Sequence, residues 1–273
     1  MPAPPKDWVA LTAKLERANE HLFKLKEFWD GFVDDGAYPV RFQDMPYGKT
    51  YRLYYLGAVA PIPADVPLVT GDAIQNLRSA LDHLAYRLVC VGTQSSGPFD
   101  RVYFPIGERA REFKARIRAI RKCLTPDAVK ALTEIEAYPG GKGESLWHIH
   151  CLNNIDKHRL LLTVTSQNRF HSMSPAEIAY IRSKFLKPLE NVPEANAPKM
   201  FLKSGRRQLS LVTGNVLEFL PISEVHENMH FPIEVAFGEP QIVKGKPVLE
   251  MLHQVADGIR NIFMTFDQFG LFD

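Results

Sequence analysis

The sequence is poor in cysteine and has no long uninterrupted apolar run. Its three cysteines, Cys90, Cys123 and Cys151, are far apart and form no CxxC pair. This spacing argues against a disulfide framework or a zinc ribbon and favours reduced thiols. No apolar run approaches the roughly 18 residues of a membrane span, and the first residues lack the apolar core of a signal peptide. We therefore expect a cytoplasmic protein without a membrane segment.

The chain also has little net charge. Its 33 basic and 31 acidic residues give a formal net charge of +2, so the overall charge indicates no particular partner. Its 273 residues are 45% hydrophobic, which is enough for one large domain or two modest ones with a sizeable core.

Apolar residues at steps of three and four predict long helices near both ends of the chain, over residues 7–30 and 247–266. Such regular apolar seams need partner helices, so we expect the two to pack against each other and against a helix that includes residues 71–88. Further helices are expected over residues 108–122 and after Thr125, which suits an N-cap.

The composition changes after residue 160. Segments rich in β-branched and aromatic residues, as strands are, follow one another there and are separated by turns that contain Gly, Pro or Asn. We expect an α+β fold in three parts. Residues 1–159 form a helical bundle with a short strand segment near 50–60. Residues 160–245 form a β-rich insertion that includes a short helix near 176–185, and residues 246–273 form a C-terminal helix that returns to the bundle.

The most informative stretch is GDAIQNLRSALDHL, which begins at Gly71. Asp72, Asn76, Ser79 and His83 follow one another at steps of four, three and four, so they share one narrow stripe of a helix. The opposite side is apolar and is typical of a core face. A polar stripe that ends in a histidine makes this helix the first candidate for a functional site.

A second polar group lies in HIHCLNNIDKHR, on a helix expected to begin near Ser145. Asn154 and His158 are four residues apart and share a face. We expect this helix to line the same site, with His158 as a second acid or base and Lys157 or Arg159 on a phosphate. The alternative is a charged helix end whose cations are favoured by the helix dipole.

The expected helix over residues 108–122 is strongly basic and has only two acidic residues, Glu108 and Glu112. Its length and charge suit the backbone of RNA, with binding that weakens in salt; a solvated helix face is the alternative. Its basic residues are Arg109, Arg111, Lys114, Arg116, Arg118, Arg121 and Lys122.

The spacing of Arg78 and His83, with four residues between them, resembles the motif of the HEPN superfamily of helical ribonuclease and nucleotide-binding domains. The run GDAIQNLRSALDHL, followed by NNIDKHR, is also similar to a largely uncharacterised bacterial family. The resemblance implies a HEPN-like bundle, an obligate homodimer and a metal-independent endoribonuclease without a cofactor. It further implies a toxin or phage-defence effector with an antitoxin or regulatory partner. Ser79 stands where active members commonly have Asn, Asp or His.

In that reading His83 is the general acid or base and Arg78 stabilises the phosphate, while Asn76 and Asp72 orient the histidine. A histidine titrates near neutral pH, and a guanidinium matches phosphate oxygens. Residues five apart on a helix point about 140° away from each other. Arg78 and His83 would therefore meet at one phosphate only in a cleft shared by two chains.

Two other functions stay open. The stripe can be structural, with Arg78 paired to Asp82 one turn away, in a non-catalytic HEPN-like RNA-binding or scaffold protein. A metal-dependent hydrolase is the other alternative, although no HExxH pair supports it. Its candidate ligands are His83, His148, His150, Asp156 and His158.

Overall fold

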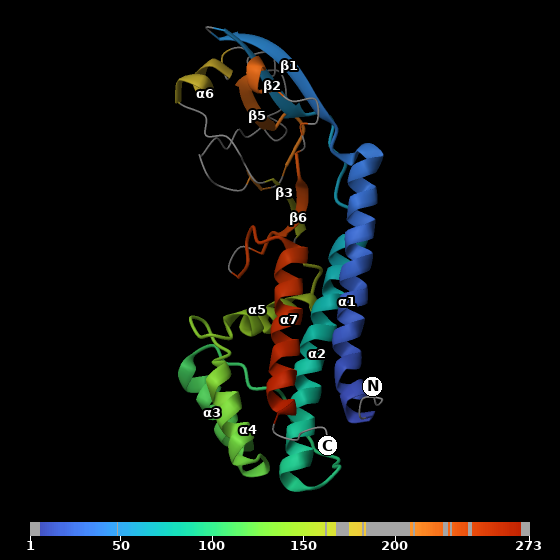
Figure 1. Ribbon diagram of the computed structural model, residues 1–273, viewed down its shortest axis with the longest axis vertical. Coiled ribbons are helices and arrows are strands. Elements are labelled where there is room, and N and C mark those ends of the chain that lie inside the picture. Colours follow the sequence, from blue (N-terminus) through green and yellow to red (C-terminus); the bar gives the residue numbers. More distant parts are fainter. Residues whose placement is uncertain are drawn as a thin grey trace. The chain divides into compact units, whose positions relative to one another are not determined.

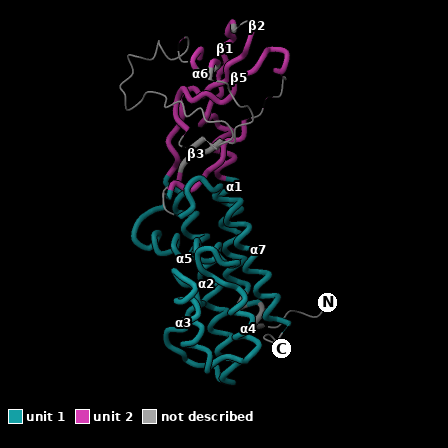
Figure 2. Tube along the Cα trace, turned by 90° about the vertical axis from the view of Figure 1, so that its left-hand side faces the viewer, with its two compact units in different colours: residues 1–27, 64–162, 239–273 teal, residues 28–63, 163–238 magenta. Residues whose placement is uncertain are grey.

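The chain has an α+β fold of long helices and short antiparallel strands (Figure 1). The computed structural model describes residues 6–47, 49–161, 163–167, 175–181, 183, 208–209, 211–225, 229, 231–239 and 242–268. The chain divides into two compact units, shown in Figure 2. Unit 1 comprises residues 1–27, 64–162 and 239–273, and unit 2 comprises residues 28–63 and 163–238.

Unit 1 is helical and is built around one central helix, α2. Its helices are α1 (Lys6–Phe32, of which the last residues belong to unit 2), α2 (Asp65–Thr93), α3 (Ala110–Ile120), α4 (Pro126–Ile135), α5 (Glu144–Asp156) and α7 (Val248–Asp267). Helix α2 packs against both α5 and α7, and α4 contacts α3 and α7. The α2 side chains that face these neighbours are apolar and fully buried, among them Ile74, Leu77, Leu81 and Leu84.

The expected helices near the two ends of the chain are confirmed. The apolar seam of α1 is buried at Leu15, Ala18, Leu22 and Leu25. Figure 1 shows α1 running along α2, and the carboxylate of Asp72 on α2 acts on the imidazole of His21 on α1. The seam of α1 thus supplies a third neighbour for α2.

Helix α2 closely approaches the short 3-10 helix Arg121–Cys123. A Cβ at Gly92 would lie 2.3 Å from the carbonyl oxygen of Cys123, so only glycine fits there without a backbone shift. The next helix, α4, begins as expected, because the hydroxyl of Thr125 accepts a hydrogen bond from the N–H of Ala128 at 3.3 Å.

Unit 2 contains two three-stranded antiparallel sheets. The strands are β1 (Val40–Tyr47), β2 (Lys49–Leu56), β3 (Thr163–Gln167), β4 (Gln208–Leu209), β5 (Val216–Pro221) and β6 (Ile233–Phe237). One sheet has the order β1-β2-β5 and the other β4-β3-β6. The short helix α6 (Pro175–Ile181) contributes Ile181 to an apolar cluster with Leu53 of β2 and Phe219 of β5.

Among the described residues, the range 160–245 contains the strands β3, β4, β5 and β6, and the two compact units divide the chain differently from the expected three parts. Residues 28–63 belong to unit 2, because β2 pairs with β5 across a long stretch of sequence. Strand β1 was not expected, since Asp44 and Pro46 are uncommon in strands. Pairing with β2 overrides this preference, and Arg52 on β2 holds Asp44 at 2.7 Å. Residues 182, 184 and 185 of the expected short helix lie outside the described residues.

Candidate functional site

The two polar motifs lie against each other, because they occupy the packed helices α2 and α5. The contact is closest at Gly71, where a Cβ would lie 2.5 Å from Oδ1 of Asp156. Glycine at this position lets the carboxylate rest on the backbone of α2. Burial raises the pKa of Asp156, and the neighbouring carboxylate of Asp72 raises it further.

Arg78 lies inside unit 1 and is held there by Asp82. The residue is 7% exposed, and its Nη1 donates to Oδ1 of Asp82 at 2.6 Å. The same oxygen accepts the backbone N–H of Phe104 at 2.9 Å. Asp82 thus neutralises a buried charge and anchors the segment that leads to α3, which is the structural role that the i, i+4 spacing allowed.

His83 is exposed, whereas Arg78 is buried. The structure therefore does not bring these two side chains together within one chain, as their spacing predicted. The stripe of Asp72, Asn76, Ser79 and His83 is the least buried side of α2, since its four residues are exposed or half-buried. A polar surface stripe on α2 is thus confirmed, while its chemistry stays a prediction.

Asp72 and Asn76 are not placed to orient His83 within the same chain. Asp72 is eleven residues away, about 16 Å along the helix axis at 1.5 Å per residue. Asn76 is seven residues away, and its amide donates to the carbonyl oxygen of Asp72 at 2.8 Å. The roles expected for these two residues would need a partner chain.

The end of the second motif contacts α2 away from His83. Helix α5 ends at Asp156, so His158, Lys157 and Arg159 follow it as exposed residues. Asp156 rests on Gly71, which is twelve residues or about 18 Å along α2 from His83. The contact of Asp156 with Gly71 thus does not place the end of α5 beside His83 within one chain, and the role of His158 stays a prediction.

Arg159 is committed to an ion pair rather than free to contact phosphate. Its Nη1 and Nη2 donate to the two carboxylate oxygens of Glu239 at 3.0 and 2.8 Å. Glu239 is 2% exposed, and this fork-to-fork geometry is the strong form of the pair. Of the two expected cations here, Lys157 alone has no interaction among the described residues that would compete with a phosphate.

The structure adds a polar cluster that the sequence did not reveal, centred on His150 of α5. The charges of Arg78, Arg116, Glu108 and Asp82 all act on its imidazole. These partners come from α2, from α3 and from the segment before α3, so no local spacing could have disclosed the cluster. We call His150 with these four residues the His150 cluster.

Burial favours the neutral form of the His150 imidazole, and one of its two ring nitrogens has no partner among the described residues. Burial is the main cause that lowers its pKa, and the cations Arg78 and Arg116 lower it further against Glu108 and Asp82. Its Nε2 lies 3.3 Å from Nδ2 of Asn154, and an amide nitrogen can only donate. Among the described residues the buried Nδ1 of the imidazole has no hydrogen-bond partner.

The neighbouring thiol takes no part in such chemistry. Burial, with a smaller effect from Glu108, raises the pKa of Cys151 to about 12, so the thiol stays protonated at neutral pH. In the part of the chain that the structure describes, no three His, Cys, Asp or Glu side chains gather as a metal site would require. The metal-dependent alternative thus has no ligand set there, and no described helix is long and apolar enough to cross a membrane.

The basic helix α3 is amphipathic, and its cations face solvent. Phe113 and Ile117 are buried, and Phe113 packs on the ring of Tyr138 at a centroid distance of 5.5 Å. The residues expected to bind RNA are all exposed, namely Arg109, Arg111, Lys114, Arg116 and Arg118.

Comparison with known proteins gives no match: no family model, no curated protein and no solved structure corresponds to this chain. The HEPN resemblance therefore depends on the two motifs alone and stays a prediction.

The half-buried position of the His150 imidazole predicts a pH dependence of stability. Its folded pKa lies below the ordinary value of 6.5, so below pH 6.5 the unfolded chain binds the proton first and stability falls. We expect His150→Gln to lose less unfolding free energy than the parent between pH 7 and pH 5. The difference is at most about 1.4 kcal/mol per pH unit, measured by urea unfolding. Curves that stay parallel from pH 8 to pH 5 would contradict the burial of this imidazole.

Proposed function

We propose that this chain is a HEPN-like RNA-binding protein and that the exposed cationic face of α3 contacts the RNA backbone. Arg111, Lys114 and Arg118 carry this proposal. At 100° per residue they fall within about 60° of one another, on the side of α3 away from the buried Phe113 and Ile117. A single exposed helix face thus presents three cations in a row.

The acidic residues nearby are already engaged and do not neutralise this face. Glu112 accepts two hydrogen bonds from Arg116, at 2.6 and 3.2 Å, and one from the N–H of Glu108. The bonds from Arg116 are the main cause that lowers the pKa of Glu112. Glu108 accepts the indole N–H of Trp147 at 3.1 Å. The carboxylate of Glu108 thus contacts α5 and that of Glu112 contacts Arg116 on α3 itself. The outward-facing cations remain available for phosphates.

The position of this face is fixed by buried contacts. Phe113 and Ile117 anchor α3, and Asp82 holds the backbone of Phe104 in the preceding segment. Cations on an anchored helix lose less freedom on binding than cations on a mobile tail. The choice of RNA among polyanions follows from the motif resemblance, and counterion release makes the binding depend on salt.

The test compares two triple variants in binding to a fluorescent single-stranded RNA of mixed sequence. We expect replacement of Arg111, Lys114 and Arg118 by Gln to weaken binding and to reduce the slope of log K against log salt by about 2, because three phosphate contacts are lost. The matched control replaces three exposed cations of α1, Arg17, Lys24 and Lys26, by Gln. Equal losses in the two variants would show a response to net charge alone and would refute the α3 face.

A second candidate function is metal-independent RNA cleavage in a homodimer, and the exposure of His83 favours it. An exposed imidazole on a polar stripe is accessible to a substrate and to a second chain. Arg78 is ion-paired with Asp82, so a bound phosphate would need another cation.

Cleavage is tested on mixed RNA with and without EDTA. His83→Ala is the informative variant, because substitution of an exposed residue changes stability by only about 0.5 kcal/mol or less. His253→Ala, on the exposed side of α7, is the matched control. The second candidate predicts cleavage that survives EDTA and His253→Ala and is lost in His83→Ala. Intact RNA with the parent protein, or a monomer in light scattering, would contradict it.

A further inference from the structure

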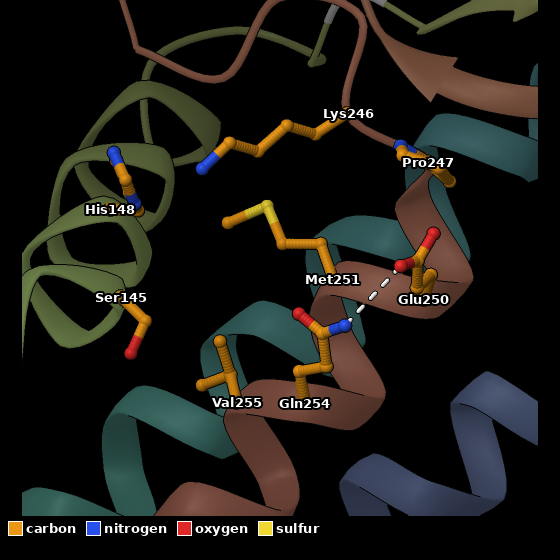
Figure 3. A pocket seen from close by; sticks show the side chains of 8 residues that line it. All are labelled: Ser145, His148, Lys246, Pro247, Glu250, Met251, Gln254 and Val255. Carbon is orange, nitrogen blue, oxygen red and sulfur yellow. Dashed lines mark hydrogen bonds between the residues drawn. The ribbon is translucent and has the colours of Figure 1, made fainter.

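Unit 1 contains a pocket between α5 and the start of α7, apart from the polar stripe and from α3. Its cavity volume is about 390 Å³, within the range of small-molecule sites. Helix α5 contributes Ser145 and His148, three residues apart on one face. The opposite wall is formed by residues 246–255, and Met251 projects into the space between the two walls (Figure 3).

The polar groups of this pocket converge at one end. The side chain of Lys246 reaches across from the segment before α7 toward His148 (Figure 3). His148 is 8% exposed and its imidazole has no hydrogen bond within the described part of the chain. The nitrogens of this imidazole are not among the buried atoms that lack a partner, so they are accessible from the pocket that the residue lines and can hydrogen-bond a ligand group there.

The pocket is lined by one lysine and one glutamate, and the side chain of Lys246 lies toward the His148 end. Burial lowers the pKa of His148, and Lys246 lowers it further against Glu144, so the imidazole is neutral at pH 7. Lys246 therefore supplies the one cation. Glu250 also lines the pocket, where it accepts a hydrogen bond from Gln254 at 3.3 Å. Its carboxylate opposes a second negative charge on the ligand.

The rest of the lining is apolar. Pro247, Met251 and Val255 form successive parts of one wall, and Met251 and Val255 are otherwise buried. Methionine adapts its shape to the molecule against it. A ligand that fits both ends of the pocket has one anionic head and a short apolar body.

We propose that this pocket binds a small organic monocarboxylate. The carboxylate lies between the ammonium of Lys246 and the imidazole of His148, and the hydroxyl of Ser145 is the next donor along the same wall. The hydrocarbon body of the ligand lies on Met251 and Val255. The site is separate from the proposed RNA-binding face and does not depend on it.

Octanoate is the probe, and octanamide is its neutral match of nearly the same shape. Binding to the full chain is measured by calorimetric titration and by the methyl resonance of Met251. We expect saturable binding of octanoate, about tenfold tighter than that of octanamide, because the charge-assisted contact is lost in the amide. We also expect a shift of the Met251 methyl resonance on addition of octanoate.

Two variants locate the carboxylate. Lys246→Gln is expected to weaken octanoate binding about tenfold and to leave octanamide binding unchanged. Lys244→Gln removes the same charge from an exposed position outside the pocket and is expected to bind as the parent does. His148→Phe keeps an aromatic ring and removes the hydrogen-bonding nitrogens, so it is expected to weaken octanoate binding as well.

The proposal is overturned by any of three results. These are no saturable binding up to the solubility limit of octanoate, equal affinities for octanoate and octanamide, and equal effects of Lys246→Gln and Lys244→Gln. A thermal unfolding curve for each variant verifies that the loss of binding occurs in folded protein.

Discussion

The buried charge of Arg78 is the constraint on which the rest of unit 1 depends. An unpaired guanidinium at this depth would be very costly, and Asp82 removes the cost at a distance of 2.6 Å. The same carboxylate oxygen fixes the backbone of Phe104, from which the chain continues to α3. The carboxylate of Asp82 therefore neutralises the buried guanidinium of Arg78 and fixes the start of the segment that leads to α3. The His150 cluster completes the arrangement, since the charges of Arg78 and Asp82 both act on that imidazole.

This arrangement changes the meaning of the Arg–His motif. Its two residues lie on different sides of α2. Arg78 is buried in an ion pair, whereas His83 is exposed. A motif match counts residues along the chain, whereas chemistry needs atoms directed at one substrate. In the RNA binding that we propose, the cations of α3 make the contacts, because their acidic neighbours are engaged with Arg116 and Trp147. The exposed His83 remains available to a shared site in a homodimer.

The periodicity of apolar residues in the sequence predicted most of the helices. Seams such as Leu15 to Leu25 predicted α1, and the N-cap Thr125 predicted the start of α4, because local spacing and capping determine these features. Strand β1 was beyond reach, since its pairing with β2 outweighs the poor strand propensity of Pro46. In the site, the spacing predicted the polar stripe and offered the pairing of Arg78 with Asp82 as the structural alternative. It missed the burial of Arg78, the capture of Arg159 by Glu239 and the His150 cluster, because each depends on contacts between distant segments.

A double-mutant cycle on Arg78 and Asp82 tests the central claim most directly. Arg78→Met, Asp82→Asn and the double variant would be unfolded in urea, with asparagine chosen because its oxygen can still accept the N–H of Phe104. Because Arg78 is buried and Asp82 is half-buried, the pair predicts a coupling free energy above about 1.5 kcal/mol, since Asp82→Asn leaves the guanidinium uncompensated inside the protein. A coupling of about 0.5 kcal/mol or less, as exposed i, i+4 pairs give, would contradict the structural role of Arg78 and return it to the candidate phosphate contacts.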